Sequence, residues 1–235
     1  MIRQLPLPLK LRDASSFENF LAGDNAELLA RVRRLVEPGA GFACLLLWGE
    51  AAAGKTHLLE AACRAAHAAG GAVQYVPLAE RAGLDPALLD GIERAALVCV
   101  DDLHAAAGDR VWEEALLGVY ERARAHGGAL LLASRLPPAG LDALLPDLLT
   151  RLRAGLVYPL KSLDDAGKIA ALRLRARNRG LDLPEDVARY VLSRYPRDLH
   201  ALFALLDRID DASLAAQRRI TIPFLRELEK INNPL

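Results

Sequence analysis

From residue 43 to residue 160, short apolar runs alternate with stretches in which apolar residues recur every three or four positions. The runs predict strands and the stretches between them predict helices. Strands that alternate with helices are typical of a parallel sheet, built by right-handed crossovers and covered on both faces. We expect strands at 43–48, 72–76, 96–101, 129–133 and 156–160, and helices at 24–36, 55–69, 86–94, 109–126 and 141–152.

The pattern changes after Lys161. Helical periodicity continues without further strands, which is typical of a small helical bundle. We therefore expect a three-layer α/β domain over residues 11–161, with a linker at 11–23, and an all-α domain over residues 162–235. The helices of the second domain are expected at 164–179, 184–195, 197–217 and 222–231.

The first ten residues form a separate segment. Pro6 and Pro8 stand at alternate positions and force Leu5 and Leu7 into extended geometry, so residues 1–10 cannot form a helix. The segment is either a tail packed on the domain or a recognition peptide for pockets on a partner.

Composition narrows the function classes. The chain has 30 basic and 30 acidic residues, so its net charge gives no global electrostatic case for binding nucleic acid. Cys44, Cys63 and Cys99 are isolated and predict neither a disulfide framework nor a zinc site. No apolar segment suits a membrane span or a signal peptide. We expect a cytoplasmic protein without a membrane partner.

The segment 49–56 has the spacing of a phosphate-binding loop, Gly-x-x-x-x-Gly-Lys-Thr. Backbone N–H groups of such a loop surround a polyphosphate, the lysine reaches the outer phosphates, and the threonine hydroxyl binds Mg²⁺. An alanine-rich turn is the alternative, but a strand and a helix flank the segment as the motif requires. Ala52 stands where related loops often carry glycine, and it would be strained if the position needs a positive φ. The predicted nucleotide-binding residues of the loop are Gly49, Glu50, Ala51, Ala52, Ala53, Gly54, Lys55 and Thr56.

Acidic residues end the predicted strand at 96–101. Asp101 stands at the carboxyl edge of the sheet, beside the loop, and can hold the Mg²⁺ bound by Thr56. Asp102 would then polarise water, and Ser134, at the end of the next strand, would sense the γ-phosphate. The alternative is an acidic strand terminus at a turn.

Four arginines stand at alternate positions in the second domain: Arg173, Arg175, Arg177 and Arg179. Steps of two residues divide them between two sides of a helix, which favours a solvated surface.

Several motifs together resemble the AAA+ core of the replication initiator DnaA. They are the loop with His57-Leu58-Leu59, Asp101-Asp102, Pro137-Pro138, Thr150-Arg151-Leu152 and Pro196-Arg197-Asp198-Leu199. Other segments are similar to the Hda family of DnaA regulators: Gln4 to Leu9, Phe17-Glu18-Asn19-Phe20, Gly23-Asp24-Asn25 and Ala212 to Arg218. The sequence ends after the predicted lid, where DnaA would continue into a DNA-binding domain, so no sequence-specific DNA reading is expected.

The resemblance implies an AAA+ P-loop domain followed by a helical lid, with ADP or ATP and Mg²⁺ as cofactors. It implies that Arg151 is an arginine finger and Arg197 a second sensor, placed by Pro196 in the first turn of a helix. It also assigns nucleotide contacts to Phe20, Asn25 and His57. The residues implied to bind the replicative sliding clamp are Gln4, Leu5, Leu7, Pro8 and Leu9.

The resemblance further implies a clamp-associated regulator that promotes hydrolysis of DnaA-bound ATP and so restrains initiation of chromosome replication. A self-sufficient ATPase, such as a helicase loader or a truncated initiator, is the alternative from the enzyme class. An inert adaptor whose nucleotide only stabilises the fold is the third. Arg151 could instead form a helix-end ion pair, and self-association as a homo-oligomer stays open.

Overall fold

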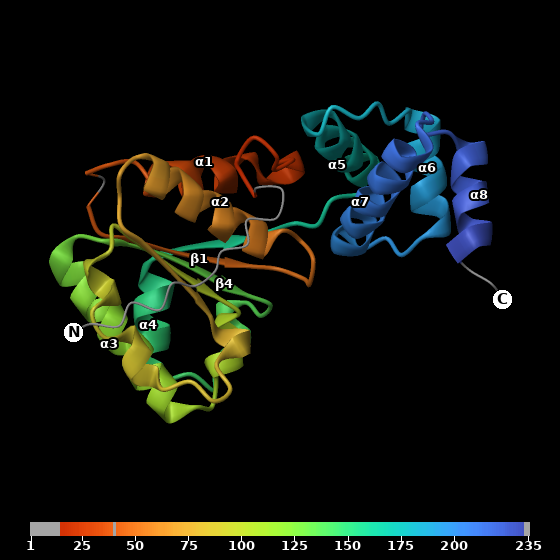
Figure 1. The fold of residues 1–235 in the computed structure, drawn as a ribbon. Coiled ribbons are helices and arrows are strands. Elements are labelled where there is room, and N and C mark those ends of the chain that lie inside the picture. The colour runs from red at the N-terminus through yellow and green to blue at the C-terminus, as the bar shows by residue number, and fades with distance from the viewer. Residues whose placement is uncertain (1–14, 40, 233–235) are drawn as a thin grey trace.

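The computed structural model describes residues 15–39 and 41–232. The described chain forms two lobes (Figure 1): an α/β lobe that contains every strand up to β5 (Leu156–Pro159), and a helical lobe that begins with α5 (Asp165–Asn178). The predicted peptide residues Gln4, Leu5, Leu7, Pro8 and Leu9 lie outside the described residues.

The α/β lobe is built on a parallel sheet in the order β2-β3-β4-β1-β5. Its strands are continuous apolar runs because helices cover both faces of the sheet. β1 lies between β4 and β5, so the phosphate-loop segment that follows it emerges at the carboxyl edge with a strand on either side. The strands are β1 (Ala43–Trp48), β2 (Val73–Pro77), β3 (Leu97–Asp101), β4 (Ala129–Ser134) and β5 (Leu156–Pro159). All the expected strands are confirmed, with small shifts at their ends.

Two layers of helices cover the sheet (Figure 1). Successive strand residues point to opposite faces: Leu45 and Leu47 of β1 pack with α1 (Ala26–Leu35) and α2 (Lys55–Ala68), whereas Cys44 and Leu46 pack with α3 (Arg110–His126) and α4 (Pro146–Ala154). The expected three-layer α/β fold is confirmed.

Three expected helices in this lobe have different bounds. α4 begins at Pro146 rather than at residue 141, because the residue before a proline is held in extended geometry. The stretch 86–94 forms two short 3-10 turns, since Gly91 interrupts it with φ +86°. Asp24 does not cap a helix; it lies in a 3-10 turn, and α1 starts at Ala26. The 3-10 turns are Gly23–Asn25, Leu78–Glu80, Pro86–Leu89, Ile92–Arg94, Leu103–Ala106 and Pro138–Gly140.

The helical lobe has an apolar core of its own, which includes Leu172, Val191, Leu202 and Phe224. Its helices are α5 (Asp165–Asn178), α6 (Glu185–Arg194), α7 (Leu199–Ala216) and α8 (Ile222–Asn232). The prediction that Arg197 lies in the first turn of a helix is wrong. Asp198 is the N-cap of α7, and its carboxylate accepts a hydrogen bond from the Ala201 N–H at 2.8 Å, so the helix starts one residue after the cap.

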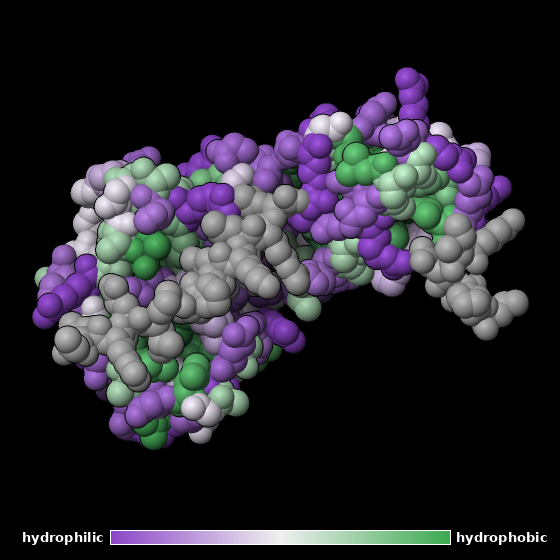
Figure 2. Space-filling model, viewed as in Figure 1, coloured by the Kyte–Doolittle hydropathy of each residue, from purple (hydrophilic) through white to green (hydrophobic). Residues whose placement is uncertain are grey.

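Hydrophilic residues predominate on the face shown in Figure 2, and the apolar residues form separate areas on each lobe. Over residues 15–39 and 41–232, no helix is long and apolar enough to span a membrane.

Candidate nucleotide site between the two lobes

The loop from β1 to α2 has the backbone geometry that its glycines predict. A Cβ on Gly49 would lie 2.5 Å from the carbonyl oxygen of Leu160, so only glycine fits there. Gly54 precedes α2 with φ +103°. Ala52 has φ +58°, a left-handed conformation that costs a residue with a side chain free energy. The expected strain at Ala52 is therefore present in this loop.

Lys55 begins α2 and turns back toward its own loop. Its Nζ donates hydrogen bonds to the carbonyl oxygens of Gly49, at 2.8 Å, and Glu50, at 2.6 Å. Burial lowers the pKa of Lys55, because a desolvated ammonium group is disfavoured. The ammonium group thus stands at the start of the loop, where it can reach the outer phosphates of a bound nucleotide.

Thr56 and Asp101 meet at the end of β3. The Thr56 hydroxyl donates to Asp101 Oδ2 at 2.6 Å, and the Tyr75 hydroxyl donates to the same oxygen at 2.8 Å. The Asp102 N–H donates to the other carboxylate oxygen at 2.9 Å. A hydroxyl and a carboxylate beside a phosphate-binding loop are the oxygen ligands that Mg²⁺ prefers. These residues therefore fit the predicted metal site.

Asp102 lines the cavity and stands between two neighbours. Its Oδ1 lies 3.9 Å from His104 Nδ1 and 3.9 Å from Arg135 Nε. Asp102 has φ +50°, a conformation that aspartate tolerates better than most residues. Burial lowers the pKa of His104, which favours the neutral imidazole beside this carboxylate.

Ser134 does not line the cavity. It is fully buried, and its Oγ accepts a hydrogen bond from the Leu136 N–H at 3.0 Å. Its carbonyl oxygen accepts one from the Gly49 N–H at 3.1 Å. Ser134 thereby fixes the start of the loop, and Arg135, the next residue, lines the cavity in its place.

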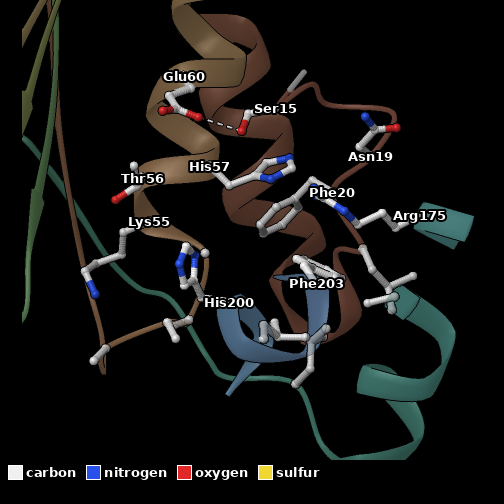
Figure 3. A pocket seen from close by; sticks show the side chains of 18 of the residues that line it. Ser15, Asn19, Phe20, Lys55, Thr56, His57, Glu60, Arg175, His200 and Phe203 are labelled. Atoms are coloured by element: carbon white, nitrogen blue, oxygen red, sulfur yellow. Dashed lines mark hydrogen bonds between the residues drawn. The ribbon is translucent and has the colours of Figure 1, made fainter. Parts of the chain in front are cut away.

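The cavity has a volume of about 1060 Å³ and is bounded by the loop, by the segment 15–20 and by the helical lobe. We call residues 15–20 the strap. Ser15 donates to Glu60 at 2.6 Å, and the carbonyl oxygen of Ser16 accepts from His57 Nε2 at 3.0 Å. Phe20 packs beside His57 (Figure 3), and the centroids of the two rings are 5.6 Å apart. The strap thus places an aromatic wall next to the first turn of α2.

The helical lobe supplies the opposite wall from α5 and α7. Of the α7 side chains, Phe203 lies toward Phe20 of the strap, whereas His200 lies toward Thr56 and Lys55 of the loop (Figure 3). The guanidinium of Arg175 lies 4.6 Å from the centroid of the Phe203 ring. Arg179 pairs with Asp207 at 2.6 Å. The expectation that this arginine cluster is a solvated surface is wrong for Arg175 and Arg179, because residues four apart share one side of a helix and that side faces α7.

Asn25 and Arg197 take different positions relative to the cavity. Asn25 lines it, but its side chain is engaged by Lys161: Nδ2 donates to the Lys161 carbonyl oxygen at 2.9 Å, and Oδ1 accepts from the Lys161 N–H at 2.8 Å. Arg197 does not line it and pairs with Asp165 at 3.1 Å.

Arg151 lies on α4, away from the cavity. Its Nε stands 2.5 Å from Glu121 Oε1 on α3, and both side chains are partly exposed. This contact is the ion pair near a helix end that the sequence analysis gave as the alternative for Arg151. The part of the side chain that is exposed can be reached by another molecule.

Four residues of the site were not predicted from the sequence. Arg135, Arg175 and Phe203 line the cavity, and Tyr75 donates a hydrogen bond to Asp101. Arg135 could have been found, because it directly follows a strand that ends at the predicted site edge. The others depend on strand order or on packing between the lobes, which local patterns do not encode.

Comparisons with known proteins agree with this architecture. Residues 11–81 match the family model described as the bacterial DnaA ATPase domain, and residues 165–228 match the one described as the lid domain of Hda. Domain III of the Thermotoga maritima replication initiation protein DnaA is similar, with a TM-score of 0.76 at 18% identity over 92% of this chain and 98% of that one.

AMPPCP-bound DnaA from Aquifex aeolicus gives a TM-score of 0.73 at 21% identity, over 86% of this chain and 66% of that one. This chain therefore spans about two thirds of the Aquifex protein. The Thermotoga maritima RuvB branch migration motor gives 0.67 at 14% identity, over 92% of this chain and 73% of that one. At such identities the structural likeness establishes the fold.

Proposed function

We propose that this chain, which is a DnaA-related AAA+ protein with an Hda-type lid, is a cytoplasmic regulator that promotes hydrolysis of DnaA-bound ATP. It would bind ADP or ATP with Mg²⁺ in the cavity between its lobes, associate with the sliding clamp, and restrain initiation of chromosome replication. The observation that carries nucleotide binding is the convergence of Lys55, Thr56 and Asp101 at one loop.

Different residues of the chain would contact different parts of the nucleotide. Lys55 would contact the outer phosphates, and the backbone of residues 49–54 would donate hydrogen bonds to them. Thr56 and Asp101 would hold Mg²⁺, which neutralises phosphate charge when bound. Phe20 and His57 would pack against the base or the sugar, and Asp102 would orient water.

Action on a partner is supported by the position of Arg151. The residue does not line the cavity; its side chain is partly exposed on α4 and paired with Glu121, an exposed ion pair that a partner's phosphate could replace. An arginine supplied in trans stabilises charge on a transferring phosphoryl group and raises the rate by about 10³-fold or more. DnaA is the partner that the DnaA-type ATPase domain and the Hda-type lid favour.

The test measures hydrolysis of DnaA-bound ATP with the chain, the clamp and DNA present together. Arg151→Ala should abolish the stimulation, because it removes the guanidinium, and should leave nucleotide and clamp binding intact. Lys55→Ala should abolish the chain's own nucleotide binding in calorimetry. Normal stimulation by Arg151→Ala would contradict a role for Arg151 in the partner's site.

The proposed contact with the clamp is tested by a second variant in the same assay. Replacing Gln4 and Leu7 by alanine should remove the dependence of the stimulation on the clamp and weaken clamp binding in surface plasmon resonance. Burying one leucine is worth about 1.5 to 3 kcal/mol, so loss of Leu7 alone predicts a decrease of tenfold or more. If the affinity for the clamp is unchanged, residues 1–10 are a tail rather than a recognition peptide for the clamp.

A self-sufficient ATPase is the second candidate, and the presence of Asp102 beside Lys55 in the cavity favours it. Turnover of ATP by the isolated chain separates the two. Sustained turnover that Lys55→Ala abolishes and Arg151→Ala leaves unchanged would support the ATPase over the regulator.

A further inference from the structure

Tyr75 lies behind the predicted Mg²⁺ site, on the strand next to the one that carries Asp101. The register of β2 with β3 places Pro77 level with Asp101. Residues two apart on a strand point to the same face of the sheet, so Tyr75 shares the face of Asp101. The Tyr75 ring packs against the apolar cluster between the sheet and α2, the helix that carries Thr56. Tyr75 is therefore fixed between two elements of the site.

Three donors from different parts of the fold meet at the Asp101 carboxylate, which is 4% exposed and does not line the cavity. Oδ2 accepts hydrogen bonds from the Thr56 hydroxyl at 2.6 Å and from the Tyr75 hydroxyl at 2.8 Å. Oδ1 accepts one from the Asp102 N–H at 2.9 Å. A buried carboxylate needs such donors, and donors at both oxygens hold its plane in one orientation.

Thr56, by contrast, is exposed and lines the cavity. Its hydroxyl has one proton and two lone pairs. Because the proton is donated to Asp101 Oδ2, the lone pairs stay available to a cation, and Mg²⁺ prefers oxygen ligands. The direction of the Thr56 hydroxyl thus depends on the position of Oδ2. Tyr75 holds that same oxygen from β2.

We propose that Tyr75 is a positioning residue for Mg²⁺, which acts by fixing the Asp101 oxygen to which the Thr56 hydroxyl donates. The inference rests on the proposed binding of nucleotide with Mg²⁺ and adds a residue on which the metal dependence relies. Tyr75 does not line the cavity, so it acts through Asp101 and Thr56 rather than by touching the nucleotide. Partners that orient metal ligands in this way typically affect metal affinity by about 10- to 100-fold when they are replaced.

The experiment measures ADP binding to the full chain by calorimetry, first with EDTA and then at increasing Mg²⁺ concentrations. Tyr75→Phe removes only the hydroxyl. It should raise the Mg²⁺ concentration for half of the metal's effect by about tenfold and change the dissociation constant in EDTA by less than about twofold. Tyr158→Phe is the matched control, since the Tyr158 hydroxyl on β5 donates to Glu27 at 2.9 Å, outside the cavity. It should leave both quantities unchanged.

A double-mutant cycle tests whether Tyr75 acts through Asp101. Asp101→Asn should itself weaken the effect of Mg²⁺ on ADP binding. Adding Tyr75→Phe to that variant should cause no further loss, because two residues that act through one contact are not additive. If the two losses add in full, Tyr75 acts by another route and the inference is wrong.

The remaining outcomes separate this inference from the proposed function. Equal loss of ADP binding with and without Mg²⁺ in Tyr75→Phe would indicate that Tyr75 only supports the fold, and an unchanged response to Mg²⁺ would also overturn its positioning role. If Mg²⁺ does not alter ADP binding by the unaltered chain, the metal site and this inference are both wrong while nucleotide binding stands. If the unaltered chain does not bind ADP in either condition, the proposed nucleotide site itself is wrong.

Discussion

Ala52 holds a left-handed backbone conformation in the middle of the phosphate loop, with φ +58°. Such a conformation costs a non-glycine residue about 1 kcal/mol or more. Glycine adopts it freely but loses about 0.4–1 kcal/mol by making the unfolded chain more flexible. The two effects oppose each other, and the first is larger.

Ala52→Gly should therefore raise the free energy of unfolding by about 0.5 kcal/mol in urea titrations. The neighbouring Ala51 does not have a positive φ, so Ala51→Gly should lower it by about the same amount. If both substitutions destabilise the chain equally, the loop stores no strain at Ala52.

Sequence alone predicts the residues whose roles are local. Loop spacing places Lys55 and Thr56, and the end of an apolar run places Asp101 at the same edge. Tyr75 could not be found in this way, because its hydrogen bond to Asp101 exists only since β2 and β3 are neighbours in the sheet. The expectation that Arg175 lies on a solvated surface is wrong, because Arg175 packs against Phe203 of α7. Helix α7 follows it in the chain, and local patterns do not show that α7 folds back onto α5.

Among the elements, the strap connects the predicted partner-binding end of the chain to the first turn of α2. Because a carbonyl oxygen can only accept a hydrogen bond, the proton of His57 resides on Nε2 in its contact with Ser16. Burial lowers the pKa of His57; the charge of Arg175 also lowers it, while the Ser16 contact and the charge of Glu60 raise it.

The stability contributed by neutral His57 should depend on pH. It is fully present above the unfolded pKa of about 6.5 and is lost as pH falls toward the lower folded pKa, because the unfolded chain gains a proton that the folded chain does not. The slope should be at most about 1.4 kcal/mol per pH unit. Urea unfolding at pH 7.5 and 5.5 should show a smaller loss for His57→Gln than for the unaltered chain. An equal loss in both would place the responsible groups elsewhere, with His104 the next candidate.

Element boundaries show the same limit of local signals. The strands were predictable because burial on both faces makes them continuously apolar. The start of α4 was not predictable in this way, because residues 141–145 have the same apolar spacing as the helix that follows them. The helix begins at Pro146, since a proline keeps the residue before it out of helical geometry. α7 begins after Asp198 for a similar reason, because a capping hydrogen bond sets its first residue.

At the scale of the molecule, the α/β lobe and the helical lobe each have apolar packing of their own, and both border one cavity. Asn178 of α5 donates a hydrogen bond to Asn19 of the strap, which joins the lobes at its edge. A nucleotide that contacts both walls should stabilise the whole chain by mass action, by about 2.7 kcal/mol at a ligand concentration 100 times the dissociation constant.

Thermal unfolding with and without ADP or ATP should therefore show an upward shift in Tm that Lys55→Ala abolishes. The variant with alanine at Gln4 and Leu7 should keep the shift, because those residues precede the strap. A shift retained in Lys55→Ala would indicate that the ligand binds outside the cavity.

The position of β1 between β4 and β5 has a consequence for synthesis on the ribosome. Ala43 pairs with Ala129 of β4, and Leu45 pairs with Leu156 of β5, so both neighbours of β1 are translated long after it. A growing chain must keep this apolar strand unpaired until β4 emerges, and contacts between residues distant in sequence form slowly. The phosphate loop therefore acquires its geometry only when the last strand is in place, and a chain truncated before β4 would expose β1 to aggregation rather than fold into a smaller nucleotide-binding unit.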